Sequence, residues 1–155
     1  MELLVLRRLK DRFSFDCGMH SEAALFSTLL SLILFKEIVS APIEGVYQTK
    51  YQNGPLDFYT PDFYQNRKEM IDKKIKMLKG DGFDDILLEM EQVWNKVTTY
   101  NEICGVMHTP ETMEWTKIVS LCKCLGGKNL AKILNRICRN PAHRSGIPDL
   151  IGTFS

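Results

Sequence analysis

The most apolar stretch of the sequence is AALFSTLLSLILF, which occupies residues 23–35. Its leucines recur at helical spacing, so we expect an amphipathic helix of about 18 residues here, with Ser21 as its N-cap. Serine and threonine interrupt the run, and Lys36 and Glu37 close it well short of the ~18 to 20 apolar residues that span a bilayer. The stretch therefore predicts a helix of a folded domain and not a transmembrane helix.

Length and charge narrow the class of protein. The chain has 155 residues with 45% hydrophobic residues, which is enough for a single domain. Because 20 Lys and Arg oppose 19 Asp and Glu, the net charge of +1 excludes a strongly basic nucleic-acid-binding chain and an acidic disordered tail. Five cysteines without a framework spacing, and the absence of a signal-peptide pattern in residues 1–10, predict a reducing compartment, the cytosol or the nucleus.

Cap, proline and glycine signals divide the remaining chain. Residues 40–60 have the composition of an ordered irregular connection. A helix capped by Thr60 should then run to Gly80. Further helices are expected over residues 84–104, 110–125 and 128–139, the break between the last two lying at Gly126. The tail GIPDLIG, residues 146–152, predicts a strand entering a sheet that these 155 residues are too short to complete.

The positive charge is concentrated in the last third of the chain. No acidic residue occurs between Thr116 and Pro148, although this segment holds seven Lys and Arg residues. At ~100° per residue, four of them share one side of the helix opposite its apolar residues: Lys128, Lys132, Arg136 and Arg139. This side is either a solvated cationic stripe or a surface for the phosphates of a polyanion. A membrane-surface or calmodulin-type helix is the weaker alternative, because the apolar side looks fitted to a core.

Several polar constellations have ordinary structural interpretations when taken alone. Glu22 is typical of a first-turn acid and Asp149 of a turn residue after proline. Cys122 and Cys124, two residues apart on a helix, should face different sides, which does not favour a zinc site. The aromatic residues near helical apolar positions are expected in the core: Tyr59, Tyr64, Trp94 and Trp115.

Four segments in order, from about residue 13 to residue 151, resemble the Fanconi-associated nuclease family. GMHSEAALFS at 18–27 is similar to that family's Gly-Ile-His-Gly-Glu-Gly-Ser-Thr-Phe-Ser segment. PLDFYTPDFYQNR at 55–67 resembles its Pro-Leu-Asp-Leu stretch with the following Ser-Phe-Tyr and Arg. LGGKNL at 125–130 resembles its Ile-Gly-Gly-x-x-Leu turn between helices. RSGIPDL at 144–150 is similar to the Arg-x-Gly-Met/Leu-Pro-Asp-Leu opening of its nuclease module.

The resemblance implies a mainly α fold, a helical bundle leading into the first strand of a truncated restriction-endonuclease-like α/β nuclease domain. Residues 1–155 would form a single unit, with a helical part at 13–126 and the incomplete start of the nuclease module at 127–155. Glu22 and Asp149 would be catalytic ligands of Mg²⁺ or Mn²⁺, whose preferred donors are carboxylate oxygens. Arg144 would join the residues Lys128, Lys132, Arg136 and Arg139 in binding DNA.

The implied activity is that of a nuclear, metal-dependent phosphodiesterase, a 5′-flap endonuclease and 5′–3′ exonuclease of DNA interstrand cross-link repair. Its expected partners are branched or flapped DNA and repair-complex proteins. The family's Glu-x-Lys, which follows the Pro-Asp aspartate, does not occur in these 155 residues. The chain alone is therefore expected to be inactive. Two alternatives are a non-catalytic helical DNA-binding or interaction module and a structural domain whose basic face is only solvated.

Overall fold

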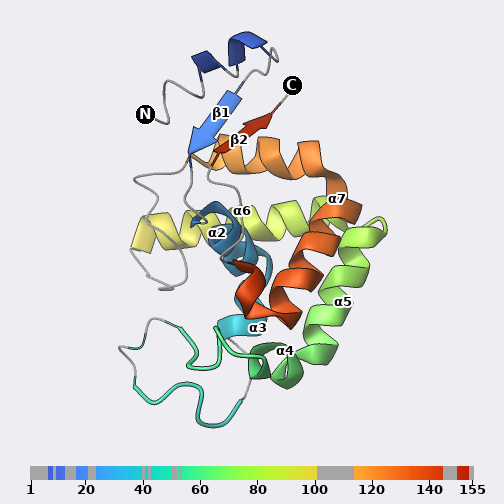
Figure 1. The fold of residues 1–155 in the computed structure, drawn as a ribbon. Coiled ribbons are helices and arrows are strands. Elements are labelled where there is room, and N and C mark those ends of the chain that lie inside the picture. The colour runs from blue at the N-terminus through green and yellow to red at the C-terminus, as the bar shows by residue number, and fades with distance from the viewer. Residues whose placement is uncertain are drawn as a thin grey trace.

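The protein is predominantly helical, as the sequence predicts. The computed structural model describes residues 7–8, 10–12, 17–20, 24–39, 41, 43–49, 52, 54–100, 114–144 and 150–153. Along the chain, the described elements are β1 (Cys17–His20), α2 (Ala24–Ile33), α3 (Phe35–Val39), α4 (Asp62–Asn66), α5 (Lys68–Lys79), α6 (Phe83–Tyr100), α7 (Trp115–Arg139), the 3-10 helix η2 (Pro141–Arg144) and β2 (Leu150–Thr153). Figure 1 shows the helices gathered around α2, with the two short strands at one end.

The apolar stretch forms the centre of the core. Leu25, Leu30, Leu34 and Ile38 are at most 1% exposed, and α2 packs against α6. The expected single helix is divided into α2 and α3 at Leu34, yet the backbone hydrogen bonds from Leu34 to Leu30 and from Ile38 to Leu34 carry the helical pattern across the junction. Ser21, the expected N-cap, lies outside the described residues. None of the described helices is long and apolar enough to cross a bilayer.

The connection before α4 is irregular, as expected, and one glutamine organises it. The Gln52 side-chain amide donates to the carbonyl oxygens of Val46, at 2.6 Å, and Gly54, at 2.5 Å. Leu56 N–H also donates to the Val46 carbonyl. Tyr59 lies in this turn and is 66% exposed, so its predicted core position is wrong. Its neighbour Phe58 is buried in its place, and the exposed Tyr59 ring packs edge-to-face on the Phe58 ring, with centroids 4.9 Å apart.

The expected helix over residues 61–79 is two helices, α4 and α5, interrupted at Arg67. Arg67 has a non-helical backbone, with φ −121° and ψ 16°. The prediction that Thr60 caps α4 is wrong, because Pro61 occupies the N-cap position. The Thr60 hydroxyl donates to the Asp57 carbonyl oxygen instead. The predicted end at Gly80 is confirmed, since Gly80 N–H donates to the carbonyls of Lys76 and Met77.

The helix α6 begins beside two acids, Asp84 and Asp85, as the sequence predicts. Acidic residues in the first turn complement the positive end of the helix dipole. Trp94 on this helix is buried and stacks on Trp115 of α7, with ring centroids 5.8 Å apart. The expected core positions of Trp94 and Tyr64 are therefore confirmed.

A glycine pair bends α7, so the predicted break between two helical segments is confirmed. Gly126 has φ 69° and ψ 158°, a conformation that residues with a Cβ atom avoid. Gly127 packs so closely on the end of α5 that a Cβ atom there would overlap the carbonyl oxygen of Leu78. The helix begins at Trp115; Thr109 and Pro110, the expected cap and first position, lie outside the described residues.

Replacing Gly127 with alanine should destabilise the fold by about 1 to 3 kcal/mol, because the added methyl group meets rigid backbone and forces α5 and α7 apart. Urea unfolding of the purified chain measures the change. Gly80→Ala is the matched control, because the nearest atom to a Cβ there is 3.6 Å away, an ordinary contact. Equal effects of the two substitutions would contradict a specific contact between α5 and α7.

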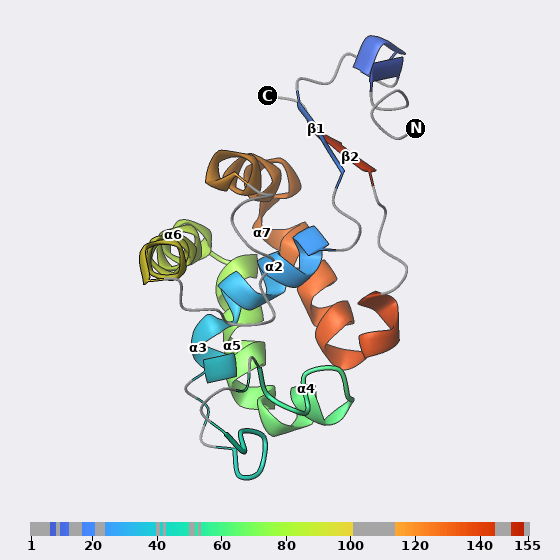
Figure 2. The same ribbon diagram turned by 90° about the vertical axis from the view of Figure 1, so that its left-hand side faces the viewer.

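The two strands join the beginning and the end of the described chain. β1 pairs with β2 in antiparallel register, from Cys17 opposite Thr153 to His20 opposite Leu150. β2 also contacts α7, and Figure 2 shows the strand pair at one end of the helical body. The sequence did not predict β1, because this four-residue segment contains none of the β-branched or large aromatic residues that are typical of strands.

Candidate functional site

The predicted basic face of the last helix is present on α7. Lys128, Lys132 and Arg136 are exposed, while Leu130 and Leu134 on the opposite side are buried. Among the described residues, none of these three cations has an ion pair with an acid. The amphipathic pattern expected for residues 128–139 is therefore confirmed, and the charges of these three residues are open to solvent.

Arg139, the fourth cation of this face, has partners within the protein. Its Nε donates to Asn135 Oδ1 at 2.8 Å, and its Nη2 lies 3.8 Å from Asp72 Oδ1 of α5. Its guanidinium also lies over the Tyr64 ring, 4.4 Å from the ring centroid. Tyr64 donates its hydroxyl to Asp72, and burial together with this hydrogen bond raises the pKa of Tyr64. Arg139 therefore links the end of α7 to α4 and α5, although its side chain remains 52% exposed.

The two predicted metal ligands, Glu22 and Asp149, lie outside the described residues, and so does the side chain of Arg144 in η2. The strands next to these two acids, β1 and β2, are nevertheless paired with each other. His20 lies opposite Leu150, at one end of the ladder. In the described part of the chain, no group of three or more His, Cys, Asp and Glu side chains is arranged to hold a metal ion.

Cys122 and Cys124 of α7 face different sides, as their spacing predicts. Cys122 is buried in the core, whereas Cys124 is exposed. Burial raises the pKa of the Cys122 thiol to about 12. Cys122 is therefore a neutral thiol packed in the core, and it behaves there as a small apolar residue.

The segment PLDFYTPDFYQNR builds a buried ion pair. Arg67 is 1% exposed, and its Nη1 donates to Asp57 Oδ2 at 2.7 Å. Arg67 also donates to the carbonyl oxygens of Glu37, at 3.0 Å, and Phe63, at 3.3 Å, while Asn66 donates to the same Asp57 oxygen. The interaction joins the turn before α4 to the end of α3. This motif is therefore structural, a role that its sequence alone does not reveal.

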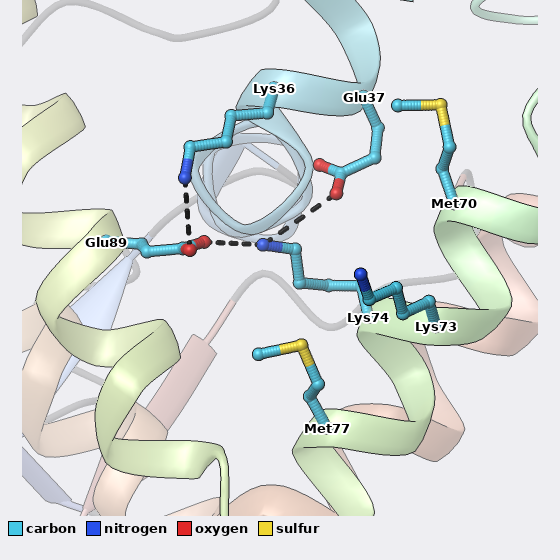
Figure 3. A pocket seen from close by; sticks show the side chains of 7 residues that line it. All are labelled: Lys36, Glu37, Met70, Lys73, Lys74, Met77 and Glu89. Atoms are coloured by element: carbon cyan, nitrogen blue, oxygen red, sulfur yellow. Dashed lines mark hydrogen bonds and ion pairs between the residues drawn. The ribbon is translucent and has the colours of Figure 1, made fainter.

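A pocket of about 420 Å³ opens between α3, α5 and α6 (Figure 3). Two methionines form much of its apolar wall, and a row of charged side chains crosses it. Lys74 lies at the centre of this row and is 6% exposed. The lining residues are Lys36, Glu37, Met70, Lys73, Lys74, Met77 and Glu89.

Lys74 holds two carboxylates in the pocket. Its Nζ lies 2.5 Å from Glu89 Oε2 and 3.7 Å from Glu37 Oε1, and Lys36 donates to the other Glu89 oxygen at 3.1 Å. Burial raises the pKa of Glu37, and its Oε2 has no hydrogen-bond partner in the described part of the protein. Burial also acts to raise the pKa of Glu89, but the hydrogen bonds from Lys74 and Lys36 outweigh it and lower this pKa. The charges are thus largely compensated by one another, so the pocket contains a structural ion network.

No protein-family model matches the sequence. Several relatives are similar to it over most of its length. A Fanconi-associated nuclease 1 homolog of Dictyostelium discoideum is 36% identical over 137 residues, which are 86% of this chain and 12% of that protein. Fanconi-associated nuclease 1 of Danio rerio is 31% identical over 88% of this chain and 14% of its own length. The Homo sapiens protein of that name is 28% identical over 90% of this chain. The chain thus spans only a small part of these relatives.

The fold is similar to part of solved structures. A crystal structure of paFAN1 bound to 2-nucleotide 5′-flap DNA with a gap superposes with a TM-score of 0.72. The match covers 86% of this chain and 23% of that chain, at 18% sequence identity. A second structure, of paFAN1 bound to 1-nucleotide 5′-flap DNA with a gap, superposes with a TM-score of 0.65. At this level of identity the likeness establishes the fold.

Proposed function

Because the chain is homologous to Fanconi-associated nuclease 1 over most of its length, and covers a small part of that protein, we propose that it forms part of a metal-dependent DNA nuclease. The proposed activity is cleavage of 5′-flap DNA, with 5′–3′ exonuclease activity, in the nuclear repair of interstrand cross-links. The strand β2 would be the first strand of a restriction-endonuclease-like module that begins near residue 127.

The observation that supports this function best is the pairing of β1 with β2. Glu22 follows the paired residue His20 by two positions, and Asp149 precedes the paired residue Leu150 by one. Because His20 lies opposite Leu150, the two acidic residues are attached at the same end of the strand pair. The antiparallel ladder thus pairs two strands that are far apart in the sequence, which supports the proposal that Glu22 and Asp149 belong to one site.

The residues fit the proposed metal. Aspartate and glutamate supply hard oxygen donors, which suit Mg²⁺ and Mn²⁺. A bound divalent ion would activate water and neutralise charge that develops on the scissile phosphate. In this proposal Glu22 and Asp149 hold the ion, and Lys128, Lys132 and Arg136 bind the DNA backbone without reading bases. Arg144 belongs to the same proposal.

The metal site is tested by Mn²⁺ binding, which does not depend on a complete nuclease. Water-proton relaxation should report saturable Mn²⁺ binding to the chain, and Glu22→Gln and Asp149→Asn should each abolish it, because either substitution removes an ionised ligand. Asp81→Asn is the control, since Asp81 is an exposed acid in the turn between α5 and α6. Equal binding by all variants would reject the assignment of Glu22 and Asp149 and would leave the non-catalytic DNA-binding module.

A further inference from the structure

The helices α5 and α7 form an antiparallel pair whose register is set at both ends. The end of α5 meets the α7 bend, where Gly127 contacts the Leu78 carbonyl. The beginning of α5 meets the end of α7, where Asp72 lies 3.8 Å from Arg139. Figures 1 and 2 both show α5 alongside the C-terminal part of α7.

Helical spacing then places further lysines beside the basic face. Lys76 and Lys79 follow Asp72 by four and seven positions, so they share the flank of α5 that Asp72 turns towards α7. On α7, Lys132 and Lys128 precede Arg139 by seven and eleven positions, so they share the flank that Arg139 turns towards α5. The four lysines are all exposed, and they line the two sides of one seam between the helices.

Little negative charge opposes these lysines. The helix α7 contains no acidic residue, and Asp72 at one end of the seam already accepts from Tyr64 and lies beside Arg139. Glu69 lies two turns before Lys76, beyond Asp72, and Asp81 lies in the turn after α5. Within the described part of the chain, Lys76, Lys79, Lys128 and Lys132 form no ion pair. The excess of positive charge along the seam is therefore uncompensated.

We propose that the seam between α5 and α7 is a binding surface for the phosphate backbone of duplex DNA, with Lys76 and Lys79 as contacts beyond the basic face of α7. The proposal rests on the proposed DNA-binding function. The dimensions of the seam suit duplex DNA, because Lys128 and Lys132 are about 6 Å apart along their helix, and packed helix axes lie about 8 to 10 Å apart. Phosphates follow one another every ~3.4 Å of axis along one strand, so each row of lysines faces about two of them.

Fluorescence anisotropy of the full chain with a labelled duplex, measured over a range of salt concentrations, tests the seam. Lys76→Gln/Lys79→Gln should weaken binding and reduce the slope of log K against log salt by about 2, roughly one for each lost phosphate contact. The matched control is Lys73→Gln/Lys96→Gln, which removes the same charge from the other flank of α5 and from α6. This control should leave the slope close to that of the unmodified chain. Circular dichroism melting confirms that each variant is folded.

A third variant, Lys132→Gln/Arg136→Gln, distinguishes DNA binding at the seam from DNA binding by α7 alone. Reduced slopes in this variant and in the α5 variant, with an unchanged control, would support the seam. A reduced slope in the α7 variant alone would overturn the seam and leave DNA binding by α7. Equal reductions in all three variants would overturn it as well, because only net charge would then matter. Unchanged slopes in all three would overturn both the seam and the DNA-binding role of α7.

Discussion

Replacing Arg67 with methionine should lower the free energy of unfolding by about 3 to 5 kcal/mol. The substitution keeps much of the side-chain volume but removes the guanidinium that lies 2.7 Å from Asp57. Asp57 would remain a buried carboxylate whose nearest remaining donor is Asn66. The carbonyl oxygens of Glu37 and Phe63 would lose a donor as well. Urea unfolding at neutral pH measures the loss.

Three further variants identify the cause of this effect: Lys68→Met, Asp57→Leu and the double variant Asp57→Leu/Arg67→Met. Lys68→Met, at the exposed neighbouring position, should change the stability by less than about 0.5 kcal/mol. Adding Asp57→Leu to Arg67→Met should restore part of the lost stability, because no unpaired charge then remains in the core. A double variant that is as unstable as the sum of the two single variants would show that packing, and not the ion pair, dominates at this position.

Replacing Lys74 with methionine should lower the free energy of unfolding by about 2 to 4 kcal/mol at neutral pH. The expected loss is smaller than for Arg67, because Glu89, one of the two partners of Lys74, is one-third exposed and partly solvated. Glu37, in contrast, would remain buried without the ammonium group, so its ionised form would lose its main compensating charge. Lys73→Met is the matched control, since Lys73 is the exposed neighbour that lines the same pocket.

The loss in free energy of unfolding caused by Lys74→Met should depend on pH. In the unmodified chain the pKa of Glu37 is raised above its ordinary value of 4.5, mainly by burial. The titration of Glu37 therefore contributes fully to stability below pH 4.5, and this contribution is lost as the pH rises through the raised pKa. The contribution of Glu89, whose pKa is lowered, is instead present above 4.5 and is lost on acidification. Without Lys74 the pKa of both acids should rise.

The variant should therefore lose most stability relative to the unmodified chain at neutral pH, and the difference should shrink as the pH falls towards about 4 and the acids become protonated. Unfolding in urea at several pH values measures this convergence. A difference that stays constant over this range would assign the effect of Lys74 to the packing of its aliphatic chain.

Short-range signals in the sequence are sufficient for most of the helical part of the fold. The end of α5 at Gly80, the acidic start of α6 and the bend of α7 at Gly126 each depend on residues within about one helical turn. The apolar and basic sides of residues 128–139 also follow from spacing alone. These features are predictable because their physical causes, the capping groups and the helical repeat, are written in consecutive residues.

Contacts between distant segments were decided only by the tertiary structure. Arginine is seldom buried, and nothing adjacent to Arg67 reveals that the end of α3 and Asp57 will surround it. Arg139 has the spacing of a phosphate ligand, yet packing places it beside Asp72 and over the Tyr64 ring.

The candidate site also combines features that follow from local sequence with features that depend on tertiary contacts. The sequence by itself determined that Glu22 and Asp149 stand in nuclease-like segments, because the motifs around them are local. It did not predict β1, whose stability comes from hydrogen bonds to a strand at the other end of the chain. Only the folded chain places His20 opposite Leu150 and α5 alongside α7, because packing and backbone pairing join residues that no local pattern relates.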